Sequence, residues 1–342
     1  MDPNSACDPD SGIFGLDVAP EDATLLLIPV PWDATTSYRA GTHRGPEAIV
    51  RASHQLDMLD RSLGVAYIDG IAMLDAPREL AVLNAEARAH AEVVIAAAGR
   101  LDARTAPHMA EVNRRSAEVN AWVRARAEEA LAAGKSIGVV GGDHSAPFGA
   151  IAALAARHPG MGVLHVDAHA DLRRAYEGFA HSHASIMDNV LDQIDGVSRL
   201  VQVGIRDFCD EELRRIDGSG GRVVTFFDED LAAERFAGAP WGALVERIVG
   251  HLPAQVYVSF DIDGLSPDLC PNTGTPVPGG LGFHEAVALI AGVVRSGRTI
   301  VGFDLCEVAP SRADADDEWD ANVGARILYK LCGWSLRSQG RL

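Results

Sequence analysis

The sequence is poor in cysteine, in basic residues and in long apolar runs. Its five cysteines are scattered and lack the paired spacing of a thiolate metal site, so we expect reduced thiols. The N-terminus has no basic region followed by an apolar run, and we expect no signal peptide. No stretch reaches the about 18 apolar residues of a membrane span. These absences predict a cytoplasmic protein. The cysteines are Cys7, Cys209, Cys270, Cys306 and Cys332.

Basic residues are also few in relation to acidic ones. The 342 residues include 30 Lys and Arg against 48 Asp and Glu, which gives a net charge of −18. Because a nucleic-acid-binding chain needs cations for the phosphates, this balance argues against such a partner. It is compatible with attraction of a cationic substrate, although an acidic surface commonly serves solubility alone.

Strand-like apolar runs alternate with helical stretches through most of the chain. The predicted strands lie near residues 24–30, 65–71, 136–140, 161–166, 199–204, 222–226, 256–260 and 299–303. The predicted helices lie near 45–53, 83–100, 108–133, 146–157, 183–193, 240–251, 283–296 and 319–332. This alternation predicts an α/β fold, a three-layer αβα sandwich with a mostly parallel sheet. We expect one domain over residues 24–342. Residues 1–23 would form an arm that is either flexible or packed on a neighbouring subunit or near the site entrance.

The stretch Asp167-Ala168-His169-Ala170-Asp171 follows one of these strands and carries a possible metal ligand at every second position. Alternate side chains of an extended chain point to the same side, so the three polar side chains leave the strand together. Carboxylates and imidazole at the C-terminal end of a strand suit a divalent metal. The alternative is an acidic strand end that faces solvent.

Two other predicted strands end in the same kind of side chain. His144 follows strand 136–140 within Gly-Gly-Asp-His-Ser, and Asp261 and Asp263 follow strand 256–260. Two imidazoles and four carboxylates are more than one ion needs, and two divalent cations would balance the four negative charges. We therefore favour a binuclear site over a single-metal site. The predicted ligands are His144, Asp167, His169, Asp171, Asp261 and Asp263.

These three motifs, in this order, resemble the ureohydrolase family of arginases and agmatinases. Supporting matches are Gly41-Thr42, Gly45-Pro46, residues 273–276 and Glu307 before Val-Ala-Pro, and the resemblance covers roughly residues 24 to 334. It implies an arginase-like fold with two divalent metal ions per chain. It also implies that hydroxide attacks the central carbon of a guanidinium group, releasing urea and ammonia or an amine.

The resemblance further implies catalytic roles. His183 matches the family's proton-shuttling histidine, with His181 as the competing choice, and Asp171 would be both a ligand and a proton relay. Glu307 matches the carboxylate that holds guanidinium N–H groups, against the alternative of an ordinary salt bridge at a strand end. Asp143 and Ser145, beside a ligand, are expected to orient it, and Arg206 to brace a loop or a subunit contact.

The ligand types do not decide between metals. Manganese is the family's usual metal, but residues 31–38 and 318–326 resemble the guanidine hydrolase branch, which is associated with nickel and includes relatives that act on metformin. We therefore expect nickel and a small guanidine or alkyl-(bi)guanide substrate. Manganese, and agmatine or 4-guanidinobutyrate, are the alternatives. Trp32 and Tyr38 either line the pocket or fix their loop to the core.

The resemblance implies an oligomer, a trimer or hexamer of identical or sister subunits. An inactive partner subunit would be expected to have lost some ligands, whereas all six, His183 and Glu307 are present. We therefore expect a catalytic subunit, which could still need a sister subunit for activity. No membrane or nucleic-acid partner is expected.

Overall fold

The computed structural model describes residues 7–66, 70–314 and 316–342. Within these residues, eight strands form one sheet in the order β2-β1-β3-β8-β7-β4-β5-β6, and each neighbouring pair is parallel. The strands are β1 Leu25–Val30, β2 Ile71–Met73, β3 Ser136–Gly141, β4 Met161–Val166, β5 Val197–Ile205, β6 Val223–Phe227, β7 Gln255–Asp261 and β8 Thr299–Cys306. The predicted α/β class and parallel sheet are confirmed.

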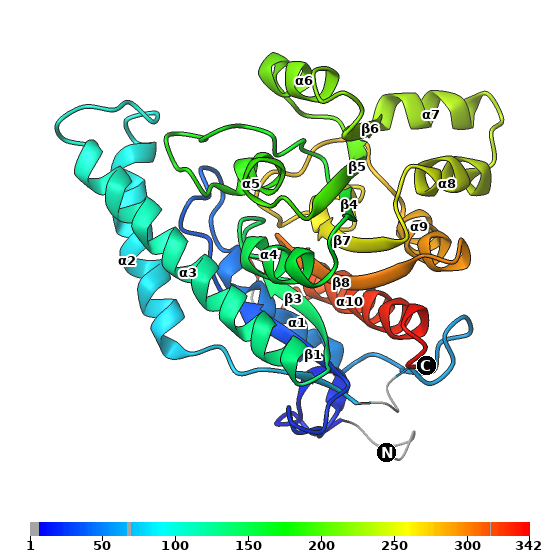
Figure 1. The fold of residues 1–342 in the computed structure, drawn as a ribbon. Coiled ribbons are helices and arrows are strands. Elements are labelled where there is room, and N and C mark those ends of the chain that lie inside the picture. The colour runs from blue at the N-terminus through cyan, green and yellow to red at the C-terminus, as the bar shows by residue number, and fades with distance from the viewer. Residues whose placement is uncertain (1–6, 67–69, 315) are drawn as a thin grey trace.

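Helices cover both faces of this sheet (Figure 1). They are α1 Gly45–Ser53, α2 Arg78–Ile95, α3 Ala106–Ala132, α4 Phe148–Arg157, α5 Ile186–Gln193, α6 Asp210–Asp217, α7 Asp228–Phe236, α8 Trp241–Gly250, α9 Phe283–Arg295 and α10 Trp319–Ser338. One apolar core joins α2, α3, α4 and α5 to the sheet, and the other joins α1, α8, α9 and α10 to it. Because both faces are covered, the central strands read as continuous apolar runs.

The sequence prediction was wrong in two places. The strand expected at 65–71 is instead β2, Ile71–Met73: Val65 and Ala66 lie in a bend and a turn, and residues 67–69 lie outside the described part. Gly70, at φ +80°, directly precedes the strand. Helices α6 and α7 were not predicted. Each buries a single residue fully, so the apolar periodicity of a packed helix is missing.

Part of the expected N-terminal arm packs on the chain's own core. Ile13 and Phe14 are buried, the Phe14 amide donates to Ser53 Oγ, and the Phe14 ring meets Tyr329 edge-on. These contacts fasten the segment to α1 and α10. Residues 1–6 lie outside the described part of the chain, and the domain boundary at residue 24 stays a prediction.

The four strands that matter for the site are neighbours at the centre of the sheet, in the order β3-β8-β7-β4. All run in the same direction, so their C-terminal ends meet at one edge. This edge is where open α/β sheets place ligands. Among the described residues, no helix combines the length and apolar character that crossing a membrane requires.

Candidate active site

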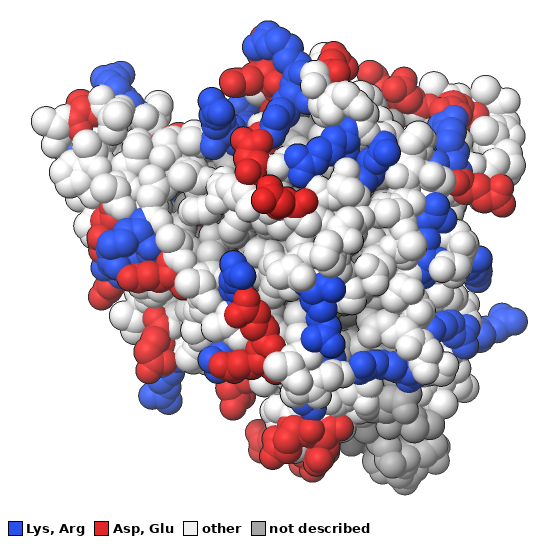
Figure 2. All heavy atoms as spheres, viewed as in Figure 1, with Lys and Arg blue, Asp and Glu red and all other residues white. Residues whose placement is uncertain are grey.

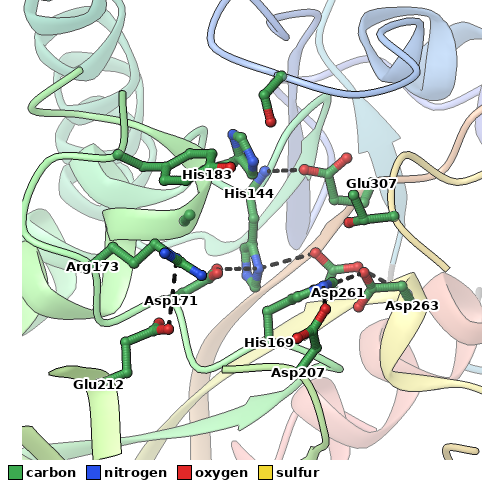
Figure 3. Close-up of a pocket in the computed structure, with 14 residues that line it drawn as sticks. His144, His169, Asp171, Arg173, His183, Asp207, Glu212, Asp261, Asp263 and Glu307 are labelled. Atoms are coloured by element: carbon green, nitrogen blue, oxygen red, sulfur yellow. Dashed lines mark hydrogen bonds and ion pairs between the residues drawn. The ribbon is translucent and has the colours of Figure 1, made fainter. Parts of the chain in front are cut away.

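Two groups of His and Asp side chains meet at this edge, and Asp167 belongs to both. In the first group, His144 Nδ1 lies 2.9 Å from Asp167 Oδ2, 3.2 Å from Asp261 Oδ2 and 3.4 Å from Asp171 Oδ2. Figure 3 shows Asp171 and Asp261 turned toward the His144 ring. In the second group, His169 Nδ1 lies 3.1 Å from Asp263 and 3.5 Å from Asp167. The structure thus brings together all six predicted ligands.

The donor atoms of these groups suit divalent cations. Within each triad Asp167–His169–Asp263 and His144–Asp167–Asp171, the donor atoms lie within 4.8 Å of one another. Oxygen and imidazole nitrogen without thiolate fit several divalent first-row metals. One carboxylate shared by two such groups is the arrangement that a binuclear site needs.

The pKa values of the cluster also reflect its concentrated negative charge. Burial, then the neighbouring Asp167, raises the pKa of Asp171 to about 6, and burial with Asp263 raises that of Asp261 well above its usual range. Burial opposes protonation of His144, but the facing carboxylates raise its pKa well above the ordinary value. The clustered carboxylates therefore favour the binding of protons or of cations.

Hydrogen bonds behind the cluster fix the His144 ring. His144 Nε2 lies 2.8 Å from Ser259 Oγ, and that hydroxyl donates to Asp304 Oδ2 at 2.8 Å. The hydroxyl therefore accepts the Nε2 proton, which directs Nδ1 toward the carboxylates, where this nitrogen can bind a cation once its own proton is released. Sequence reasoning missed Ser259 and Asp304. The sequence pattern could have indicated Ser259, because it lies two residues before Asp261 on the same face of β7.

His165 is a further missed residue. Its Nε2 lies 2.8 Å from Asp167 Oδ2, and Gln202 Nε2 donates to its other ring nitrogen at 3.0 Å. A fully buried imidazole thus holds the carboxylate that both groups share. It also lies two residues before a ligand, on the same strand face.

Two glycines let the backbone pass close to these ligands. A Cβ on Gly142 would lie 2.1 Å from Trp32 O, and a Cβ on Gly264 would lie 2.7 Å from Asp167 N. Side chains at these two positions would displace the turns that carry His144 and Asp263. Both glycines are therefore required by close packing.

A cavity of about 150 Å³ opens above the cluster. His183 and Glu307 line it, together with Ser37, Thr275, Arg173 and Tyr176. Glu307 Oε1 accepts from the His144 amide at 3.0 Å, and burial followed by Asp143 and Asp263 raises the pKa of Glu307 well above its usual range. Asp171 and Glu307 both have left-handed backbones, at φ 54° and 63°. Such strain at two pocket carboxylates is typical of functional sites.

The two candidate histidines differ in position. His183 lines the cavity, and burial followed by His169 and His144 lowers its pKa to about 4. His181 is not a lining residue, and its ring packs against Phe148 instead, with centroids 5.6 Å apart. The structure therefore places His183 and not His181 beside the His/Asp cluster.

The remaining predicted residues stand around the site. Asp143 accepts from Ser145 and from Thr35 Oγ1, which fixes the turn that carries His144. Arg206 braces loops, as expected, by donating to the carbonyls of Asp263, Leu265 and Val277. Trp32 is buried in the core and does not line the described cavity.

Figure 2 shows both acidic and basic side chains on one face of the molecule, without an extended acidic area. On that face, the charge of −18 is not gathered into one acidic patch. The negative charge that matters for a cation is the buried cluster.

Comparison with known proteins decides the family. A model of the arginase family matches residues 23–333, nearly the whole chain. The chain belongs to the arginase family. N(1)-aminopropylagmatine ureohydrolase from Thermus thermophilus is 35% identical, over 94% of each chain, and that from Synechocystis is 30% identical, over 93% of this chain and 91% of the relative. The structure of proclavaminate amidino hydrolase from Streptomyces clavuligerus superposes with a TM-score of 0.71 at 25% identity, covering 98% of this chain and 99% of that one.

Arginase-family ureohydrolases are hydrolases of C–N bonds in amidines and act on small cationic guanidino substrates. They are binuclear divalent-metal enzymes, which agrees with the buried His/Asp cluster of this chain. The predicted reaction class and arginase-like fold are confirmed.

Proposed function

We propose that this family member hydrolyses the guanidino C–N bond of a small guanidine or alkyl-(bi)guanide. The observation that carries the reaction is the pair of His/Asp groups joined by Asp167 beneath a cavity lined by Glu307 and His183. In this proposal, His144, Asp167, Asp171 and Asp261 would hold one cation, and His169, Asp167 and Asp263 would hold the other. When bound, the two cations would supply the hydroxide nucleophile by lowering the pKa of water at the site.

The chain's own residues bind the substrate and move protons. Glu307 accepts guanidinium N–H groups and fixes the plane of the substrate, since charge-assisted paired hydrogen bonds are strong and directional. Asp171 carries a proton toward the leaving nitrogen. His183, which lines the cavity wall, exchanges that proton with solvent.

The preference for a compact substrate rests on Arg173. Its guanidinium lines the cavity 5.0 Å from the centre of the Tyr176 ring. The cationic tail of a longer substrate would meet this like charge. Motifs 31–38 and 318–326 support the same substrate class by their resemblance to guanidine hydrolases, and although Ser37 of the first motif lines the cavity, the second motif lies outside the cavity wall. Asp320, for example, is buried and accepts from Asn272.

Agmatine or a related amine-tailed guanidine is the second candidate, and Asp207 favours it. This carboxylate lines the cavity and its side chain is 67% exposed, so a terminal ammonium could pair with it. Arg173 is partly neutralised by Glu212 at 3.6 Å. The relatives named N(1)-aminopropylagmatine ureohydrolase support this candidate as well.

Urea release decides between the candidates. Purified protein would be loaded separately with nickel and with manganese and given guanidine, metformin, agmatine, 4-guanidinobutyrate or N(1)-aminopropylagmatine. We expect the highest kcat/KM with nickel and with guanidine or metformin. A higher kcat/KM for an amine-tailed substrate would replace the first candidate by the second.

We further propose that the chain is a catalytic subunit of a trimer or hexamer, homo-oligomeric or shared with a sister subunit. The complete ligand set supports a catalytic role. Bound metal near two ions per chain without turnover of any of these substrates would indicate that a sister subunit is missing.

A further inference from the structure

A second cavity, of about 190 Å³, lies at the opposite edge of the sheet. Ser136, Gln255 and Thr299 line it, and they are the first residues of β3, β7 and β8. The catalytic cavity lies where these strands end, so the two cavities are separated by the length of the strands. Four of the residues that line the second cavity are basic, and none is Asp or Glu. The basic residues are Lys135, Arg157, His158 and Arg341.

Backbone carbonyls, which carry no net charge, hold two of these cations. Lys135 Nζ donates to the carbonyls of Glu21 and Ala23, both at 2.7 Å, and Arg341 Nη2 donates to that of Gly134 at 2.7 Å. Among the described residues, no carboxylate lies within ion-pair distance of Lys135, Arg157 or Arg341. The carbonyls orient the side chains but leave their charge uncompensated, in a chain whose net charge is −18.

His158 adds a neutral donor to this group. Gln255 Nε2 donates to His158 Nδ1 at 3.0 Å, so the proton of the neutral ring lies on Nε2. Burial, then the adjacent positive charge of Arg157, lowers the pKa of His158. The ring therefore stays neutral beside several cations, with one N–H group left to donate.

We propose that this cavity binds a small oxyanion of the size of sulfate or phosphate, with Arg157 and His158 as its donors and Lys135 and Arg341 as supporting charges. Such an anion would neutralise the positive charges that the uncharged backbone carbonyls cannot neutralise. Hydrogen bonds from guanidinium to an oxyanion are among the strongest in proteins. This site is independent of the proposed reaction and of its metals.

Calorimetric titration of the metal-loaded enzyme with sulfate tests the proposal. Arg157 is the residue to change, because it is exposed at the end of α4 and its side chain makes no described hydrogen bond. We expect Arg157→Ala to weaken sulfate binding at least about tenfold and Arg157→Lys to recover part of it. The matched control is Arg247→Ala, which removes an arginine that is paired with Glu234 elsewhere. Sulfate that binds at the metal centre is common to all variants and cancels in the comparison.

The pKa of His158 gives a second, site-specific measurement. A bound anion stabilises the imidazolium, so sulfate should raise the pKa of His158 measured by NMR, with His158→Gln assigning the signal. Urea release should be unchanged in Arg157→Ala. Equal sulfate affinity in the wild type and Arg157→Ala, or a His158 pKa that sulfate does not move, would overturn the proposal.

Discussion

At the scale of single residues, Glu307 is fixed by hydrogen bonds to the protein and still lines the catalytic cavity. Its backbone N–H donates to Gly142 O at 2.7 Å, and one carboxylate oxygen accepts from the His144 amide. The other oxygen faces the cavity. Removing the charge of the Glu307 carboxylate should therefore weaken substrate binding and turnover more than it disturbs the metal ligands.

Glu307→Gln should lower kcat/KM by about 10- to 100-fold, because one strong charged hydrogen bond to guanidinium is replaced by a weak neutral one. Steady-state urea release gives the ratio, and bound metal should stay at the wild-type level. Asp207→Asn, at the rim of the same cavity, is the control and should change the ratio less for guanidine. An unaltered kcat/KM in Glu307→Gln would reject the proposed role.

His183 and His181 allow a matched pair of variants. His183→Asn should lower kcat by about 10²- to 10⁴-fold, the range for loss of a general acid–base group, with metal content maintained. His181→Asn should have a much smaller effect, because that ring packs on Phe148 outside the cavity. If the two variants lost equal activity, or His181→Asn lost more, the assignment of the proton shuttle to His183 would be wrong.

Asp33, which is not one of the predicted metal ligands, gives a further pH dependence. Burial alone would raise its pKa, but hydrogen bonds and charge from His43, with Asn84 and the Gly41 amide, lower it to about 2. A folded-state pKa below the unfolded value of 3.8 means that Asp33 stabilises the fold above about pH 4, and that this stabilisation is lost as pH falls toward 2.

Asp33→Asn removes this contribution. The difference in unfolding free energy between the wild type and Asp33→Asn should therefore shrink by about 1 kcal/mol between pH 5 and pH 3. Urea unfolding of both proteins after chelation would measure it. If the difference in unfolding free energy stayed constant with pH, the ionised Asp33 carboxylate would not be the source of the pH-dependent stability.

At the scale of elements, the loop over residues 172–182 is fastened to the hairpin of α2 and α3. Phe179 is fully buried in an apolar cluster with Ala91 and Met109. Asn113 of α3 accepts from the Ala180 amide at 2.8 Å and donates to Gly178 O at 3.2 Å. The same loop carries Arg173 and Tyr176, so the helical hairpin sets one wall of the catalytic cavity.

Asn113→Ala removes both hydrogen bonds and should mainly raise KM, by several-fold to about tenfold, since each bond contributes about 1 kcal/mol. The metal content should not change, because the ligands lie on other elements. Asn120→Ala on the same helix is the control: the side-chain nitrogen of Asn120 is buried without a described partner. A fall in kcat and metal content without a change in KM would show a general loss of structure.

The elements also show what the sequence could predict. The central strands were found because both of their faces are buried, which makes them continuous apolar runs ending in ligand motifs. Helices α6 and α7 were missed because they bury almost nothing. Five of the six ligands recur at every second residue, and His165 and Ser259 continue these series, but the hydrogen bonds of His165 to Gln202 and of Ser259 to His144 join residues from different strands and cannot be read from local spacing. The resemblance to the family favoured His183 over His181, but only the folded loop shows that His183 lines the cavity and that His181 does not.

At the scale of the whole molecule, the site gathers like charges that are far apart in the sequence. His144, Asp167 and Asp261 come from three strands and meet only when the sheet is complete. Four carboxylates share a buried space in this fold, and burial with the neighbouring negative charges raises the pKa of two of them, Asp171 and Asp261, above the usual range. Folding and metal binding are thus coupled.

Because of this coupling, we expect Asp261→Asn to change the Tm in opposite directions in the presence and in the absence of metal. The metal-free variant should melt at or above the Tm of the metal-free wild type, because one member of the repelling cluster is neutral. With nickel or manganese it should melt below the wild type, because a proposed ligand is lost. The metal stabilises the wild type by about 2.7 kcal/mol for each site at 100 times its Kd. Thermal scans of both proteins, with chelator and with added metal, measure the four Tm values. Equal metal-induced shifts in the two proteins would show that Asp261 does not bind the cations, whereas a crossing of the two pairs identifies it as a ligand that costs stability until the metal is present.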